Sequence, residues 1–169
     1  VAIGAAIPPL ALPTLDGDEL ALADLVDRPT VALFWNPGCG YCQAMLEDLR
    51  GWERQRRDDE PRLVVISSGT AGDTHADGFA STVLLDEEFA AGNAFGANGT
   101  PMGVLLAPDG TVASAVVAGS DDVLGLLRAP AATSSRRSTR CRRAATAPAL
   151  MATCWSTSAS SSCAAPRAR

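Results

Sequence analysis

Two cysteines separated by two residues, Cys39 and Cys42, stand between an apolar run and an amphipathic helical pattern. The run at residues 31–35 is continuously apolar, which is typical of a strand covered on both faces. From residue 39 to residue 57 the apolar side chains recur at helical spacing, so we expect a helix there. A sulfur at a helix N-terminus faces unpaired backbone N–H groups that favour its thiolate, and the second sulfur lies one turn deeper. The sequence therefore predicts a dithiol site at a strand-to-helix junction.

The sequence around this junction predicts an α/β domain over residues 1–128. A second apolar run at residues 63–66 follows the helix, and strand, helix and strand in this order imply a right-handed parallel crossover. Asp16-Gly17 and Asp109-Gly110 signal turns, and each lies between two short apolar stretches. We therefore expect a hairpin at each end of the domain, pairing 10–15 with 20–26 and 104–107 with 111–118. The other expected elements are a loop at 67–78, a strand at 82–85 and helices at 86–95 and 123–128.

The last part of the chain differs in composition from the domain. Residues 1–128 carry all nineteen acidic residues and seven arginines, a net charge of −12, whereas residues 129–169 carry seven arginines and no acid. Ala, Ser, Arg and Thr account for 32 of those 41 residues. Such a segment cannot bury enough apolar surface to offset its ordering entropy, so we expect a disordered low-complexity tail. Translation in a shifted reading frame is the alternative origin.

Composition also limits the partners and the location. The chain has no apolar stretch of the roughly 18 residues that a membrane span needs, and its net charge is −5. We expect no membrane span in this chain and no nucleic-acid partner. The chain begins with Val, so either an upstream segment is missing or a non-standard start codon was read literally.

The alternatives for the cysteine pair are a structural disulfide and half of a zinc site. Zinc would need two further ligands, and the predicted domain offers one histidine, His75, and no second cysteine pair. We therefore expect redox chemistry with no metal. Cys39 would attack and Cys42 would resolve the mixed disulfide, and the Cys39–Cys42 disulfide would be the only redox group required.

A second motif, Thr100-Pro101, precedes a strand in the second half of the domain. We expect a cis peptide bond that places the backbone of Thr100 against the dithiol, where it can pair with an extended substrate. A trans proline opening an edge strand is the alternative. Trp35, Gly40 and Tyr41 complete the candidate substrate-contacting residues, with Trp35 as core or as a wall beside the disulfide and Tyr41 exposed between the cysteines.

Together these motifs resemble thioredoxin-fold redoxins of the TlpA/MauD type, within the redoxin and AhpC/TSA-like superfamily. The resemblance covers about residues 3–128. It implies a thioredoxin-like fold, with a central mixed β-sheet flanked by helices and an N-terminal β-hairpin. It also implies a monomeric thiol–disulfide oxidoreductase that acts on protein thiols and disulfides, supplied by an upstream electron donor or acceptor. An extracytoplasmic location follows from the resemblance alone, with a cytoplasmic one as the alternative. The matching segments are Ile3-Gly4 to Pro8, Leu15-Asp16-Gly17, Phe34 to Cys42, Thr100-Pro101 and Pro108-Asp109-Gly110.

Some residues depart from the pattern of the wider family. Thioredoxin has an acidic residue six positions before its first cysteine, and this chain has Leu33 there. A thiol-dependent peroxidase is an alternative function, but the positions where peroxiredoxins carry Thr or Ser and Pro hold Asn36 and Ala32. The other alternative is a non-functional or structural product with an aberrant C-terminal tail.

Overall fold

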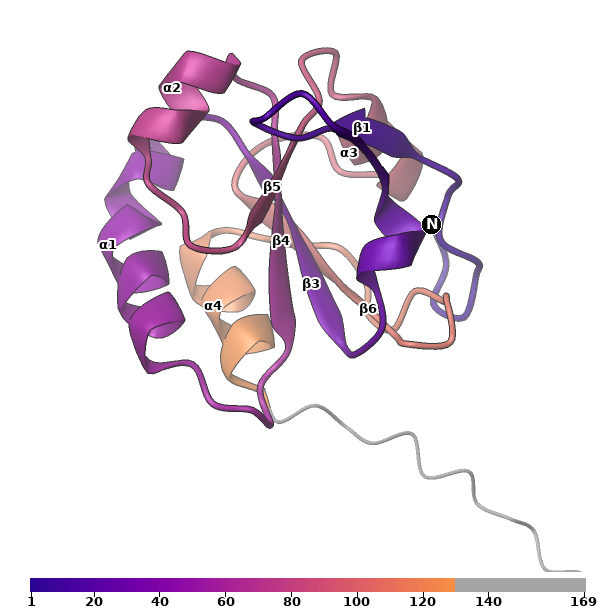
Figure 1. The fold of residues 1–169 in the computed structure, drawn as a ribbon. Coiled ribbons are helices and arrows are strands. Elements are labelled where there is room, and N and C mark those ends of the chain that lie inside the picture. Colours follow the sequence, from indigo (N-terminus) through magenta and orange to yellow (C-terminus); the bar gives the residue numbers. More distant parts are fainter. Residues whose placement is uncertain (130–169) are drawn as a thin grey trace, which may run out of the picture. The chain divides into compact units, whose positions relative to one another are not determined.

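A mixed sheet in the strand order β5-β4-β3-β6-β7 forms the centre of the computed structural model (Figure 1). The structure describes residues 1–129, so almost all of the predicted tail lies outside the described residues. β3 pairs in parallel with β4 and antiparallel with β6, and this mixture is the one predicted. The strands are β3 Thr30–Trp35, β4 Arg62–Ser67, β5 Thr82–Leu85, β6 Met102–Leu106 and β7 Val117–Ala118.

Side-chain alternation along β3 divides the core into two layers, because successive side chains of a strand point to opposite faces. All six residues of β3 are buried. Val31, Leu33 and Trp35 face one layer, while Ala32 and Phe34 face the other. The continuous apolar run read from the sequence is thus a strand covered on both sides.

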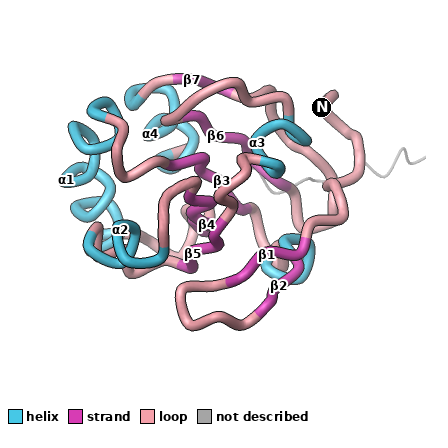
Figure 2. Tube along the Cα trace, turned by 90° about the horizontal axis from the view of Figure 1, so that it is seen from above, coloured by secondary structure: helices cyan, strands magenta, loops and turns pink. Residues whose placement is uncertain are grey.

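Helices α1 Gly40–Gln55 and α4 Ser120–Arg128 cover the Leu33 face of the sheet (Figures 1 and 2). α1 buries the stripe expected from helical spacing, Cys42, Met45, Leu46, Leu49 and Trp52. Its outer side is polar, so burial of this one face is what fixes the helix on the sheet.

The N-terminal hairpin and α3 Ala90–Phe95 cover the opposite face. β1 Ala11–Pro13 pairs antiparallel with β2 Glu19–Ala21, and a 3-10 helix follows at Leu22–Leu25. The predicted N-terminal hairpin is therefore present, with shorter strands than expected. No helix within residues 1–129 is long and apolar enough to cross a membrane.

The expected loop at 67–78 was wrong, because a short helix, α2 Ala71–Ala76, lies inside it. Thr70 begins the helix, since its side chain accepts a hydrogen bond from the backbone N–H of Asp73 at 3.2 Å. Thr74 is the helix's one buried residue. A helix with so little apolar surface leaves no periodic pattern in the sequence.

The expected long strand at 111–118 was also wrong. Only Val117–Ala118 is a strand, although Val112 makes an isolated bridge to Leu106. Ser114 explains the interruption, because its Oγ accepts the backbone N–H of Leu105 at 2.9 Å. A side-chain hydroxyl thereby occupies a position that a strand carbonyl would hold, and the chain leaves the sheet.

Candidate dithiol site

The turn between β3 and α1 is organised by Asn36. Its Oδ1 accepts the backbone N–H of Gly38 at 2.8 Å, and its backbone oxygen accepts the N–H of Cys39 at 3.0 Å. Its Nδ2 donates to Ser68 Oγ at 3.1 Å, which fastens the turn to the end of β4. Asn is suited to this place because its short side chain can replace backbone partners in a tight turn. The turn presents Cys39 at the N-cap of α1.

Cys39 is partly buried and its sulfur lies at the start of α1, where backbone N–H groups lack helical partners. Partial burial is the largest single influence on the pKa of Cys39 and raises it. Hydrogen bonds from the N–H groups of Cys42 and Tyr41 and from the Thr100 side chain oppose burial, and together they lower the pKa below its ordinary value. The thiolate, which is the nucleophilic form, is therefore favoured at Cys39.

Cys42 is fully buried against the sheet, one turn further along α1. Burial raises the pKa of Cys42 to about 12, against the opposing effects of the Asn36 backbone and the Thr100 side chain, and the nearby Cys39 adds to the rise. The two sulfurs thus lie close together, both as free thiols, with opposite pKa shifts. One is suited to attack and the other to remain protonated until the first has reacted.

Thr100 and Pro101 immediately precede β6, which pairs with β3 on the side opposite to β4. This pairing brings them next to the dithiol. The Thr100–Pro101 peptide bond is cis, as the sequence predicts. The Cys39 thiol donates to the Thr100 carbonyl oxygen at 3.3 Å. This contact stabilises the thiol, whereas the Thr100 side chain stabilises the thiolate, so one residue offers a partner to each form of Cys39.

A groove of about 290 Å³ opens beside this contact. Tyr41 and the segment from Asn98 to Met102 line one part of it, and the segment from Ala118 to Ser120 lines the rest. Tyr41 is 80% exposed, as expected for a residue between the cysteines. The groove therefore joins an exposed aromatic ring to the Thr100-Pro101 turn within reach of the dithiol.

Two of the predicted site residues differ in exposure. Gly40 is exposed at the first position of α1. Trp35 has no exposed surface, and its ring packs edge-on against Phe79 at a centroid distance of 5.2 Å. Its indole Nε1 donates to Asp77 at 2.7 Å. Trp35 therefore supports the site from the core and has no surface to offer a partner.

Two residues at the site were missed by sequence reasoning. Asp77 lies just beyond α2 and is only 6% exposed. Gln43 directly follows Cys42, and its Nε2 donates to Asp77 Oδ1 at 3.0 Å. Gln43 could have been singled out by its position, since it is the polar residue after the second cysteine. Asp77 left no signal, because its segment lacks periodicity and lies 34 residues from Gln43.

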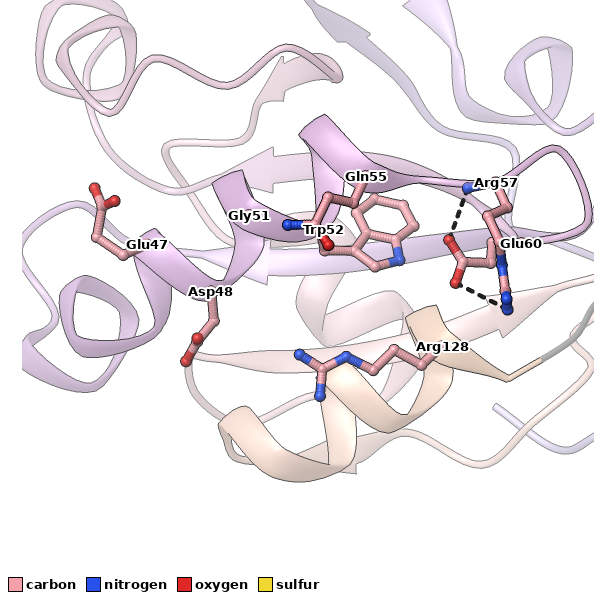
Figure 3. A pocket seen from close by; sticks show the side chains of 8 residues that line it. All are labelled: Glu47, Asp48, Gly51, Trp52, Gln55, Arg57, Glu60 and Arg128. Atoms are coloured by element: carbon pink, nitrogen blue, oxygen red, sulfur yellow. Dashed lines mark hydrogen bonds and ion pairs between the residues drawn. The ribbon is translucent and has the colours of Figure 1, made fainter.

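A second hollow, of about 530 Å³, lies between the later turns of α1 and the end of α4 (Figure 3). Trp52, Arg57, Glu60 and Arg128 are among its lining residues, and the Trp52 Nε1 atom is buried without a hydrogen-bond partner among residues 1–129. Trp52 lies ten positions after Cys42 in the same helix, which places it about 15 Å further along the helix axis. No predicted site residue lines this hollow. Within residues 1–129, no three potential metal-ligating side chains of His, Cys, Asp or Glu gather in one place.

Comparison with known proteins gives the same architecture. A sequence model of a family described as a thioredoxin-like domain matches residues 17–121. No curated protein sequence matches the chain significantly. The thioredoxin domain of a thiol-disulfide oxidoreductase from Bacteroides vulgatus aligns with a TM-score of 0.61 and 19% identity, over 74% of this chain and 94% of that one. A secreted Mycobacterium tuberculosis disulfide oxidoreductase, homologous to DsbE of E. coli, aligns with a TM-score of 0.58 and 22% identity, over 70% of this chain and 94% of that one. At these identities the likeness is one of fold.

Proposed function

The chain belongs to the thioredoxin-like domain family, and we propose that it is a thiol–disulfide oxidoreductase that exchanges disulfides with partner proteins through Cys39 and Cys42. The observation that carries the proposal is the geometry of the pair: Cys39 is partly buried at the N-cap of α1, 3.3 Å from the Thr100 carbonyl oxygen, and Cys42 is buried one turn deeper, so the pKa values of the two thiols shift in opposite directions. A lowered pKa supplies a nucleophile at neutral pH, and a raised pKa keeps the second thiol in reserve. The thiol–disulfide oxidoreductases with the same fold support this role.

In the reducing direction, the Cys39 thiolate attacks one sulfur of a partner disulfide and releases the other sulfur as a thiolate. Cys42 then gives up its proton and attacks Cys39 Sγ, which breaks the mixed disulfide and releases the second partner thiol. Two electrons pass to the partner, and the chain is left with a Cys39–Cys42 disulfide. An upstream dithiol restores it, and the same steps in reverse oxidise a partner. No further cofactor takes part in the proposed reaction.

The partner is proposed to lie along the groove that Tyr41, Thr100 and Pro101 border. The Thr100 carbonyl oxygen, 3.3 Å from Cys39 Sγ, is the group a partner backbone would meet next to its own cysteine. Backbone pairing of this kind depends little on partner sequence, which suits an enzyme acting on extended cysteine-containing segments. We propose an extracytoplasmic location, supported by the secreted protein with this fold.

The decisive experiment is a trap for the mixed disulfide. Cys42→Ser removes the resolving thiol, so partner proteins should remain attached to Cys39 on non-reducing gels and dissociate on reduction. Cys39→Ser is the matched control, because it removes the proposed nucleophile and keeps the buried Cys42, while both variants retain the three cysteines at positions 141, 154 and 163. Equal trapping by both variants, or trapping by neither with a model disulfide protein such as insulin, would contradict the proposal. Peroxide consumption by the wild-type protein tests the alternative of a thiol-dependent peroxidase.

A further inference from the structure

A buried carboxylate lies beside the dithiol loop and takes no part in the reaction above. Asp77 is 6% exposed and accepts a hydrogen bond at each carboxylate oxygen. Oδ2 accepts from Trp35 Nε1 at 2.7 Å, and Oδ1 accepts from Gln43 Nε2 at 3.0 Å. Both donors adjoin the reactive segment, since Trp35 ends β3 and Gln43 follows Cys42. Asp77 thus connects the strand before the dithiol with the helix after it.

Gln43 makes a second contact with the same nitrogen. Its Nε2 donates to the Pro37 carbonyl oxygen at 3.0 Å. Pro37 belongs to the turn that presents Cys39, and the preceding residue, Asn36, organises that turn through its hydrogen bonds. A primary amide has two N–H bonds, so it can serve both acceptors at once. One exposed side chain therefore joins the turn to a buried anchor.

The charged groups near this link have other partners. The Arg50 guanidinium, on α1, donates to the backbone oxygen of Asp77 at 3.0 and 2.6 Å and pairs with Glu47 at 2.8 Å. These bonds fix the Asp77 backbone and leave its carboxylate to Trp35 and Gln43. Hydrogen bonds from Trp35, Gln43 and Arg50 therefore fix the position of Asp77. Because its carboxylate is buried, breaking these hydrogen bonds would be costly.

We propose that Gln43 is a positioning residue for the dithiol, which holds the Cys39-bearing turn in place by linking the Pro37 carbonyl to Asp77. The inference rests on the proposed function, in which Cys39 is the nucleophile. The N–H groups of Tyr41 and Cys42 stabilise the Cys39 thiolate only while the turn keeps the sulfur over the start of α1. Loss of the link would loosen that alignment without changing either cysteine.

The test measures alkylation of reduced, full-length protein by iodoacetamide over a range of pH. Gln43→Met keeps the length and helix propensity of the side chain but removes both hydrogen bonds. We expect the pH midpoint of Cys39 alkylation to rise in this variant. A rise of half a pKa unit lowers the thiolate fraction about threefold at pH values below the midpoint, so the alkylation rate there should be about threefold lower. Gln55→Met is the matched control, because Gln55 is exposed near the far end of the same helix. It should leave the profile unchanged.

A double-mutant cycle tests whether Gln43 acts through Asp77. In Asp77→Leu, no side-chain oxygen remains to accept the hydrogen bond from Gln43, so the link loses its anchor. If both substitutions break one link, the double variant should shift the profile no further than the larger single shift. Additive shifts would overturn the proposal, and so would a wild-type profile in Gln43→Met. If Asp77→Leu does not fold, the comparison of Gln43→Met with Gln55→Met decides alone.

Alkylation needs a nucleophilic thiol but no partner protein. Failure of the Cys42→Ser trap would therefore count against the proposed function, whereas an unshifted Gln43→Met profile would count against the positioning role. The melting temperature of each variant separates a local change in the turn from general destabilisation. If the alkylation midpoints of the variants rise only in proportion to their loss of melting temperature, the positioning role would also be overturned.

Discussion

The Sγ atom of Cys39 lies 3.3 Å from the carbonyl oxygen of Thr100, although the two residues are 61 positions apart in the sequence. β6 brings them together by pairing antiparallel with β3, which leads directly into the dithiol turn. The nucleophile and its neighbouring backbone are therefore held by adjacent strands of one sheet. A site built in this way depends on strand pairing more than on any flexible loop.

Mild alkylation of the reduced protein near neutral pH should label Cys39 before Cys42. The pKa of Cys39 is lowered and its sulfur is partly exposed, whereas the pKa of Cys42 is about 12 and its side chain is buried. Peptide mass spectrometry after a short reaction checks the order of labelling. Preferential modification of Cys42 would reverse the assigned roles, and urea-unfolded protein, in which both thiols are exposed, is the control.

The stability of the reduced protein should depend on alkaline pH. The pKa of Cys42 is higher in the folded protein than in the unfolded chain. The contribution of Cys42 to the free energy of unfolding is therefore fully present below about pH 8.5 and is lost as the pH rises toward about 12. Cys39, whose folded pKa is lowered, contributes in the opposite sense, with stability that grows as pH rises through its folded pKa. Above the ordinary cysteine pKa the loss from Cys42 should dominate.

Melting temperatures of reduced and oxidised protein at several pH values between 8 and 11 measure this dependence. The oxidised protein has no titrating thiol at the site, so the difference between the two curves of melting temperature against pH reports the titration of Cys39 and Cys42. A reduced-minus-oxidised difference that stays constant or increases over this range would contradict the assignment for Cys42.

Gly69→Ala should destabilise the protein and displace the dithiol turn. A Cβ at this position would lie 2.5 and 2.6 Å from the Pro37 ring, which is rigid and cannot turn aside. Overpacking of this kind costs about 1–3 kcal/mol, and relief requires Pro37 to move. Urea denaturation together with the Cys39 alkylation rate measures both effects.

Gly72→Ala is the matched control for that substitution. Gly72 lies in α2 and nothing stands within 4 Å of its would-be Cβ. Alanine is favoured over glycine in a helix by about 0.5–1 kcal/mol, so this variant should be as stable as the parent or more so. Equal destabilisation by both alanines would show that contact with Pro37 is not the cause.

The sequence carried enough information to predict the sheet and the cysteine pair, but not the groups that surround them. The apolar run of β3 and the stripe from Cys42 to Trp52 are periodic, so their burial could be predicted, and the thioredoxin-like fold is confirmed. Asp77 could not be found, because its burial depends on the fold of α2 rather than on any local pattern. Ser114 interrupts an apparently regular strand through one side-chain hydrogen bond, an effect that alternation does not reveal.

We propose that residues 1–128 form a self-sufficient domain. The buried core of the described residues extends from Ile7 to Leu127, and α4 ends at Arg128. A chain ending at Arg128 should therefore keep the cooperative thermal transition and the insulin-reduction rate of the full-length protein. Calorimetry on both chains makes the comparison. Loss of the transition in the shorter chain would place part of the folding information after residue 128.

The long separation between Cys39 and Thr100 also has a consequence for synthesis. A ribosome releases the cysteine pair well before it releases the strand that completes the site, because β6 begins only at Met102. During that interval the two thiols are present on a nascent chain without the Thr100 carbonyl or the β3–β6 pairing beside them. The redox properties that depend on Thr100 are thus acquired late, only once β6 has left the ribosome and paired with β3.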